Sequence, residues 1–152
     1  MNKPKTKILF LTSEISPFSE TYQLAEFSKK FSTLVNNSED FEIRISQALK
    51  CGISEDNIII DPGIGFGKSI SQNKRLINEL HYFTELGYPI LIGPSRKSFI
   101  GYTLNLPVEE RLEGTAAAIS IGIARGADII RVHDVKSMAR VTRMTDSLVR
   151  NT

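Results

Sequence analysis

The chain has 152 residues, of which 41% are hydrophobic and 24% are charged, and its formal net charge is +2. This length suits one domain with a sizeable core, and the balanced charge excludes the strong basic bias typical of nucleic-acid or membrane-surface binding. A single cysteine, Cys51, excludes an internal disulfide and a cysteine-rich metal cluster, and it indicates a reducing compartment. We therefore expect a cytoplasmic protein with no nucleic-acid or membrane partner.

The first predicted element is a strand over Ile8–Leu11, ended by turn-forming residues. This apolar run is too short for a signal sequence or a membrane helix, so no export is expected. Apolar residues then recur at helical spacing between Glu20 and Leu34, and again over Phe41–Lys50. The pattern predicts two helices, the second of which ends at Gly52.

The strand Asn57–Ile60 contains three β-branched residues in succession, so we expect it to be buried on both faces. After it comes Asp61–Lys68, with the sequence DPGIGFGK, in which three glycines permit positive φ angles and close approach of a ligand. The spacing fits neither a Walker A loop nor the dinucleotide fingerprint. An ordinary glycine-rich turn would not account for the carboxylate, Phe66 and Lys68 together, and we predict a loop that binds a small molecule.

Strands and helices alternate through the rest of the chain. The predicted elements are a helix over Asn73–Leu86, a strand over Pro89–Ile92, a polar loop over Gly93–Ser98, a helix over Val108–Arg125, a strand over Ile129–His133 and a helix over Val135–Val149. This order predicts an α/β fold with about four parallel strands covered by helices, either as an open sheet or as half of a (β/α)₈ barrel. Right-handed crossovers place all strand ends on one side, where Asp61, Lys97, Arg131 and His133 should converge.

Several of these residues also have a simpler interpretation. Lys68 and Arg96 fit solvated loop cations, and Lys68 fits that description better than a ligand contact. His133 fits a hydrogen-bonded residue at a helix start. Arg131 is harder to explain without a ligand or carboxylate partner, because it lies within an apolar run. Arg111 is expected to pair locally with Glu113 near the start of a helix.

Four motifs together resemble the carboxy-terminal half of dihydropteroate synthase, a (β/α)₈ barrel, over residues 41–150. They are Asp61–Lys68 (DPGIGFGK), Gly93–Gly101 (GPSRKSFIG), Glu110–Thr115 (ERLEGT) and Ile130–Val135 (IRVHDV). The resemblance implies a transferase that condenses a hydroxymethyl dihydropterin pyrophosphate with para-aminobenzoate and releases pyrophosphate. A pterin-dependent methyltransferase is a related alternative, which the loop Ser95–Ser98 disfavours.

The resemblance also implies roles for individual residues. Asp61 would accept hydrogen bonds from the pterin ring, and Lys97 would reach both substrates. Arg131 would stack on the pterin and hold the pyrophosphate together with His133. The implied catalytic residues are Lys97 and Arg131. The implied substrate-binding residues are Asp61, Gly63, Gly65, Phe66, Lys97, Ser98, Arg131 and His133, with Phe66 and Ser98 beside the aminobenzoate.

The front of the chain departs from this family. Its metal-binding asparagine is not found before Phe41, so the Mg²⁺ that the family implies has no ligand here and we predict no metal site. Residues 5–35 resemble instead the amino terminus of bacterial glycogen synthases, although Glu20–Gln23 replaces that family's Lys-Thr-Gly-Gly loop. We therefore expect a chimeric chain, with a βα unit of other origin over residues 1–40 and a half barrel over residues 41–152.

A half barrel has consequences for activity and for assembly. Because part of the pterin site would be missing, we expect a synthase that is incomplete in this chain. The alternative is an inactive fragment or chimera that retains a partial pterin and pyrophosphate site, or only the scaffold. The open sheet edges of a half barrel also favour a homodimer.

Overall fold

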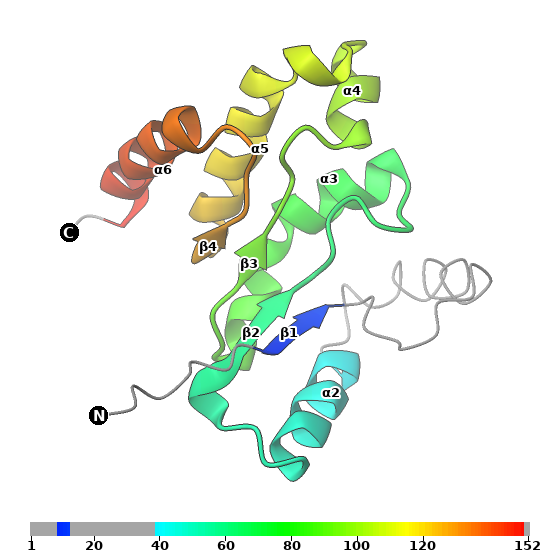
Figure 1. The fold of residues 1–152 in the computed structure, drawn as a ribbon, viewed down its shortest axis with the longest axis vertical. Coiled ribbons are helices and arrows are strands. Elements are labelled where there is room, and N and C mark those ends of the chain that lie inside the picture. Colours follow the sequence, from blue (N-terminus) through cyan, green and yellow to red (C-terminus); the bar gives the residue numbers. More distant parts are fainter. Residues whose placement is uncertain (1–8, 13–38, 151–152) are drawn as a thin grey trace, which may run out of the picture.

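The computed structural model of the protein describes residues 9–12 and 39–150, with side chains from residue 44 onward. Within these ranges, short parallel strands run through the middle of the molecule (Figure 1). They are β1 (Leu9–Thr12), β2 (Ile58–Asp61), β3 (Leu91–Ile92) and β4 (Ile129–Ile130). β1 pairs with β2, β3 pairs with β4, and a parallel bridge between Ile60 and Ile90 joins the two pairs. The predicted parallel sheet of about four strands is therefore confirmed, in the order β1-β2-β3-β4.

The register places the carboxyl ends of the strands together. Thr12 lies opposite Asp61 at the ends of β1 and β2, and Ile92 lies opposite Ile130 at the ends of β3 and β4. The residues that follow β3 and β4 are Gly93 and Arg131. The polar segments that follow β2, β3 and β4 therefore lie together at the carboxyl ends of the strands.

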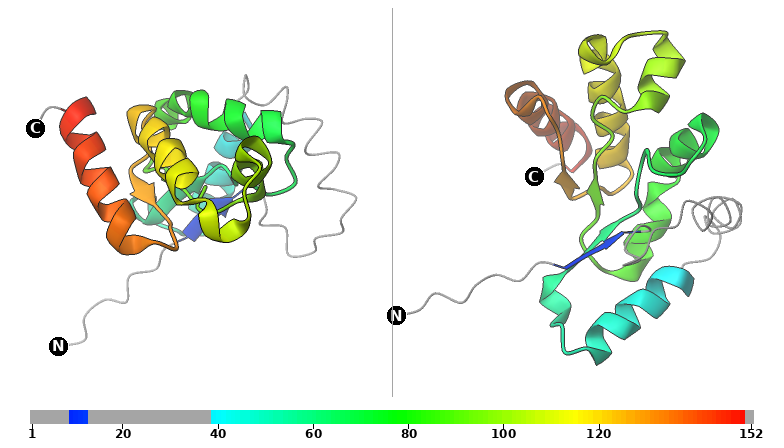
Figure 2. Two further views of the ribbon diagram at one scale, coloured as in Figure 1. Left: turned by 90° about the horizontal axis from the view of Figure 1, so that it is seen from above. Right: turned by 45° about the vertical axis from the view of Figure 1, so that its right-hand side comes forward.

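The described helices connect these strands. They are α2 (Glu39–Lys50), α3 (Ile70–Asn78), α4 (Ser98–Leu104), α5 (Leu112–Ala124) and α6 (Val135–Val149), with 3₁₀ segments η1 (Glu55–Asn57), η2 (Leu80–Leu86) and η3 (Val108–Glu110). α3 packs on α5 and α5 packs on α6, so these three follow one another around the sheet (Figure 2). α2 contacts β1 instead. No helix within residues 39–150 has the length and apolar content needed to cross a membrane.

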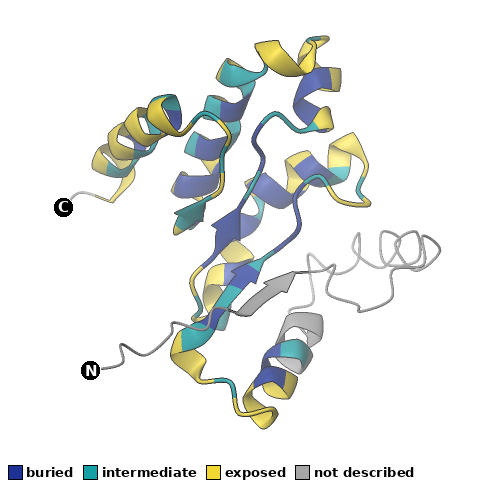
Figure 3. Ribbon diagram, viewed as in Figure 1, coloured by how far each residue is buried: buried dark blue, intermediate teal, exposed yellow. Residues whose placement is uncertain are grey.

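The core lies between the strands and these helices (Figure 3). The larger apolar cluster joins α2, α3, η2 and α4 to β2 and β3, and its most buried members are Ile58, Ile60, Ile64, Leu76, Leu80, Ile90 and Ile92. A smaller cluster of Ile119, Ile123 and Met138 packs α5 against α6. Gly122 lets α5 approach the sheet, because an added Cβ there would collide with Ile92 Cδ1.

β2 is not buried on both faces, and this expectation was wrong. Ile58 and Ile60 are 1% and 0% exposed, whereas Ile59 and Asp61, which point to the opposite face, are only partly buried. On β2 one face is therefore covered more completely than the other, whereas both residues of β3, Leu91 and Ile92, are buried. A β-branched run therefore indicates a strand here without indicating two covered faces.

The helices differ from the sequence-based expectation in several places. α6 has the predicted bounds, but the predicted helix over residues 73–86 is divided into α3 and η2, and α3 begins earlier at a capping box of Ser69 and Gln72. The predicted helix over residues 108–125 is divided in the same way into η3 and α5, and α4 was not predicted at all. The helix expected between residues 20 and 34 lies outside the described residues.

Candidate functional site

A cavity of about 350 Å³ opens at the carboxyl ends of β2, β3 and β4. Its lining comes from the segments that follow these strands and consists of Asp61, Ile64, Phe66, Gly93, Ser95, Lys97, Arg131, Val132 and His133. The volume suits a small organic molecule, and ligand sites of parallel α/β sheets lie at this edge. Residues that are 70 positions apart in sequence therefore share one site because the strands are parallel and adjacent.

Asp61 is the only acidic residue in this lining, and it is partly buried. Its Oδ1 accepts a hydrogen bond of 2.8 Å from the Gly63 N–H. Burial raises the pKa of the Asp61 carboxyl above its ordinary value, while the Gly63 bond and the positive charges of Lys97, Lys68 and Arg131 oppose the rise. The result is a poorly hydrated acceptor that faces cations.

Asn73, which the sequence analysis did not single out, holds the glycine loop in place. Its side chain is 2% exposed, and its Oδ1 accepts a bond of 2.6 Å from the Gly65 N–H. Its amide donates to the carbonyls of Lys68 and Ser69. A buried asparagine one turn after a glycine-rich loop is the signal that could have identified it, because a buried amide needs several partners.

Lys68 closes the same loop and is not a solvated cation. Its ammonium donates to the carbonyls of Gly63 and Phe66 at 2.7 and 3.0 Å. The interpretation of Lys68 as a solvated cation was therefore wrong. Lys68 is also not part of the cavity lining. Together with Asn73, Lys68 gives the loop from Asp61 to Ser69 a fixed shape that uses its own backbone groups.

Lys97 joins this loop to the segment after β3. Its ammonium lies 3.6 Å from the centre of the Phe66 ring and donates a hydrogen bond to the Ile64 carbonyl. Gly65 makes this position possible, because its φ is +85° and an added Cβ would overlap the Lys97 side chain. One glycine therefore serves two needs, a left-handed backbone and space for the lysine.

Arg131 and His133 follow β4 and present positive or hydrogen-bonding groups to the cavity. The backbone of Arg131 is fixed by the bond from its N–H to the Ile92 carbonyl, and its side chain is exposed. Within residues 44–150 the Arg131 guanidinium makes no ion pair. The His133 ring is held by Ser95, whose Oγ lies 3.0 Å from Nδ1. An exposed guanidinium beside a held imidazole suits the binding of an anion.

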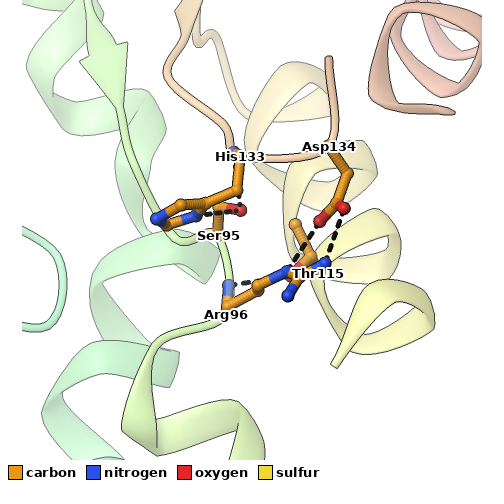
Figure 4. Close-up of polar contacts among 5 residues, drawn as sticks. All are labelled: Ser95, Arg96, Thr115, His133 and Asp134. Carbon is orange, nitrogen blue, oxygen red and sulfur yellow. Dashed lines mark hydrogen bonds and ion pairs between the residues drawn. The ribbon is translucent and has the colours of Figure 1, made fainter. Parts of the chain in front are cut away.

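Arg96 is paired rather than solvated. Its guanidinium makes two bonds to the Asp134 carboxylate, at 2.8 and 2.6 Å (Figure 4). This pairing lowers the pKa of Asp134 and raises that of Arg96. Arg111 donates to the carbonyls of Arg96 and Leu106 instead of pairing with Glu113, so that expectation was also wrong.

The structure brings together five of the eight residues expected to bind substrate. Asp61, Phe66, Lys97, Arg131 and His133 line the cavity. Gly63 and Gly65 shape the loop without lining the cavity, and Ser98 begins α4 on the exposed surface, also outside the lining. The sequence analysis did not assign Ile64, Gly93 and Val132, which carry no distinctive chemistry, nor Ser95, a polar residue of the loop after β3.

The charges of the cavity do not suit magnesium. Asp61 is the single carboxylate of the lining, and the positive charges of Lys97 and Arg131 already interact favourably with it. Among the described residues, no three His, Cys, Asp or Glu side chains are grouped so that they could hold a metal ion. The residues that the structure describes therefore fit an anionic ligand better than a cation.

Comparison with known proteins identifies the family of the chain. The family model described as "Pterin binding enzyme" matches residues 11–133. The dihydropteroate synthases of Clostridium beijerinckii and Bacillus subtilis are 43% and 52% identical over 157 and 102 residues, covering 92% and 67% of this chain but 58% and 36% of their own length. A dihydropteroate synthase of Coxiella burnetii, solved with pteroic acid, superimposes with a TM-score of 0.76 at 35% identity, over 95% of this chain and 52% of that one.

The chain spans about half the length of these relatives, and its strands and helices correspond to part of an α/β barrel. The family match includes most of the segment for which another origin was expected, and the resemblance to glycogen synthases receives no support from these relatives. Because the family model matches residues 11–133, which is most of the chain, the chain belongs to the pterin-binding enzyme family, and the relatives named above are dihydropteroate synthases.

Proposed function

We propose that this chain binds a hydroxymethyl dihydropterin pyrophosphate and takes part in its condensation with para-aminobenzoate. The observation that carries the proposal is the distribution of charge in the cavity, with a partly buried carboxylate on β2 and cationic or donor groups on the segments after β3 and β4. A pterin ring offers neighbouring N–H donors, and a pyrophosphate offers acceptors. The pteroic acid bound to the Coxiella relative supports the same ligand class.

Each residue would have one task in this reaction. Asp61 would accept hydrogen bonds from the pterin ring and so fix its orientation. The amine of the aminobenzoate would attack the methylene carbon, whose bond to the pyrophosphate oxygen breaks. Arg131 and His133 would stabilise the negative charge that develops on the leaving pyrophosphate. Lys97, which contacts Phe66 and the Ile64 carbonyl, would lie between the two substrates and reach either one.

The proposal includes slow turnover by this chain alone. The chain covers 58% of the Clostridium relative, and its described residues carry four strands of a barrel. Each absent transition-state donor costs about a hundredfold or more in rate. Because the residues that line the cavity do not suit a magnesium ion, the proposed steps assign no role to one. An assay of dihydropteroate formation from the two substrates measures turnover, and a rate equal to that of a full-length synthase would contradict this part.

Binding tests the proposal directly. Titration calorimetry with a dihydropterin pyrophosphate should show saturable binding that Arg131→Ala abolishes. Arg140→Ala removes another exposed arginine, on α6 and outside the cavity lining, and should leave binding unchanged. If the wild-type protein and Arg140→Ala both fail to bind the ligand, the chain is an inactive fragment that retains only the scaffold.

We also propose that two copies associate through the open edges of the sheet. The N–H groups of Ile129 and Arg131 donate to the carbonyls of Ile90 and Ile92, so the N–H of Ile130, which lies between them, points away from β3. If β4 of each copy paired with β1 of the other, the two four-stranded sheets would form one closed sheet of eight strands. The backbone groups of both edge strands would then be hydrogen-bonded. Sedimentation should show a dimer at high concentration, and a strictly monomeric species would exclude it.

The separate origin of residues 1–40 stays a hypothesis. The family match that begins at residue 11 does not require it. Exchanging residues 1–40 for the aligned segment of the Clostridium relative tests whether the two are equivalent. Unchanged cooperative unfolding would remove the reason to assign this segment to another family.

A further inference from the structure

Two loops of the cavity are joined at two adjacent pairs of residues. Ser95 contacts His133, and Arg96 contacts Asp134, so that neighbours on the loop after β3 meet neighbours on the loop after β4 (Figure 4). Of these four residues, the proposed reaction uses only His133. The joint therefore raises the question of what Ser95 does for His133.

The loop that carries Ser95 and Arg96 is itself fixed by α5. Arg96 has a φ of 56°, which is unusual for a residue with a side chain. Its N–H donates to Thr115 Oγ1 at 3.0 Å, and its carbonyl accepts from Arg111 at 2.9 Å. Thr115 is fully buried. Ser95 is thus presented by a backbone that does not depend on a ligand for its shape.

The hydrogens around Ser95 can be assigned. Its Oγ accepts the backbone N–H of His133 at 3.2 Å and lies 3.0 Å from His133 Nδ1. The side chain of Ser95 is buried, at 4% exposure, and within residues 44–150 no other acceptor is recorded for its hydroxyl hydrogen. A buried hydroxyl hydrogen without an acceptor is unfavourable, so the hydroxyl donates to Nδ1. In the neutral imidazole the remaining hydrogen must then be on Nε2.

The other edge of the ring is the one available to a ligand. Figure 4 shows the second ring nitrogen on the side of the ring away from Ser95, and His133 is an exposed residue of the cavity lining. The charged groups that line the same cavity are Asp61, Lys97 and Arg131, and Asp134 is bound to Arg96. An Nε2–H donor in the same lining as the cations Lys97 and Arg131 would add to a site for an anion.

We propose that Ser95 is a positioning residue that fixes His133 in the Nε2–H form and so presents it to a bound pyrophosphate as a hydrogen-bond donor. The Arg96–Asp134 pair holds the backbone of the same loop, which keeps the ring within reach of Ser95. Protonation of the ring would place hydrogens on both nitrogens, and Nε2 would remain a donor. His133 is therefore unsuited to accept a proton from the attacking amine through Nε2. This inference rests on the proposed function only for the identity of the anion.

The tautomer is measured on the free protein by ¹⁵N nuclear magnetic resonance of the imidazole nitrogens at about pH 8.5, where an ordinary imidazole is neutral. The chain has two histidines, and the exposed His81 on η2 provides the internal reference. His133 should show the Nε2–H form more completely than His81. In Ser95→Ala its signals should approach those of His81, and Ser95→Thr, which keeps the hydroxyl, should restore them. A wild-type His133 in the Nδ1–H form, or one that Ser95→Ala leaves unchanged, would overturn the proposal.

A second measurement separates this inference from the proposed function. Inorganic pyrophosphate should bind wild type and Ser147→Ala equally, because Ser147 lies on the exposed surface of α6, and should bind Ser95→Ala about tenfold more weakly. Absence of binding to wild type would contradict the proposed function while the tautomer measurement still decides the role of Ser95. Binding that is equal in wild type and Ser95→Ala would contradict the positioning role and leave the proposed function standing.

Discussion

The ammonium nitrogen of Lys97 lies 3.6 Å from the centre of the Phe66 ring, which connects the loop after β3 to the glycine loop after β2. The same nitrogen donates to the Ile64 carbonyl, so the lysine is held by an aromatic face and a backbone acceptor of one loop. A residue of the proposed reaction is therefore placed by a neighbouring strand's loop rather than by its own. Changes in the glycine loop should be detectable at Lys97.

A double-mutant cycle measures this connection. Phe66→Leu and Lys97→Met should show a coupling of about 0.5–1 kcal/mol in the free energy of urea unfolding, because a partly exposed cation–π contact is worth about that much. Phe66→Leu combined with Lys136→Met, on the exposed start of α6, is the control and should be additive. Equal coupling in both cycles would remove the assigned contact.

Gly65→Ala should remove pyrophosphate binding as well as lower stability. Its positive φ costs a residue with a Cβ about 1–2 kcal/mol, and the Cβ would also displace Lys97. Gly52→Ala is the matched control, since Gly52 has a φ of +82° with nothing within 4 Å of an added Cβ. Urea unfolding should show a similar backbone cost for both variants, and calorimetry should show a binding defect only for Gly65→Ala.

Asp61→Asn should increase stability at neutral pH and weaken pterin binding. Because burial raises the pKa of the folded carboxyl, ionisation opposes folding. The stability associated with the protonated form is fully present below the unfolded pKa, about 4, and is lost as pH rises through the raised folded pKa. The asparagine keeps an acceptor for Gly63 but loses one of the two acceptor oxygens that neighbouring pterin N–H groups need.

Unfolding measured between about pH 4 and pH 8 checks the sign, because the advantage of Asp61→Asn over wild type should grow with pH. Asp56→Asn changes an exposed aspartate in η1 and should not show this growth. An advantage that is constant with pH would mean that burial does not control the ionisation of Asp61.

Arg96→Gln should produce the opposite dependence on pH. The Arg96 guanidinium lowers the pKa of Asp134, so the stability from this pair is present above the unfolded pKa and is lost as pH falls through the lowered folded pKa. The destabilisation by Arg96→Gln should therefore be larger at about pH 7 than at about pH 2.5, as followed by thermal unfolding.

Arg75→Gln is the control for this change. Arg75 and Glu79 form an exposed pair one helical turn apart, and such pairs contribute about 0.3–0.5 kcal/mol. Arg96→Gln should cost more stability than Arg75→Gln at neutral pH, because Arg96 also connects two loops. An effect no larger than that of Arg75→Gln would show that Thr115 and Arg111 hold the Arg96 loop without the ion pair.

The sequence predicted the parts of the fold that depend on local patterns. Short β-branched runs located β2, β3 and β4, and apolar spacing located α6 with its observed bounds. Parallel strands with right-handed crossovers also imply that residues after the strand ends meet, which is where the structure places Asp61, Lys97, Arg131 and His133.

Features that depend on distant residues were missed. α4 contains Gly101, which weakens the helical pattern and leaves space that the Arg111 guanidinium occupies. The bonds from Ser95 to His133 and from Arg96 to Asp134 each join residues 38 positions apart, and nothing in the local sequence marks such pairs. The interpretation of Arg96 as a solvated cation failed for this reason.

Asn73 affects ligand affinity because it orders the glycine loop before a ligand binds. Glycines lose more conformational entropy on ordering than any other residue, and three of them lie between Asp61 and Lys68. Because Asn73 and Lys68 already bond the backbone of this loop, its ordering occurs when the chain folds. A ligand therefore binds a loop that is already ordered. Binding does not carry the entropy loss of ordering three glycines.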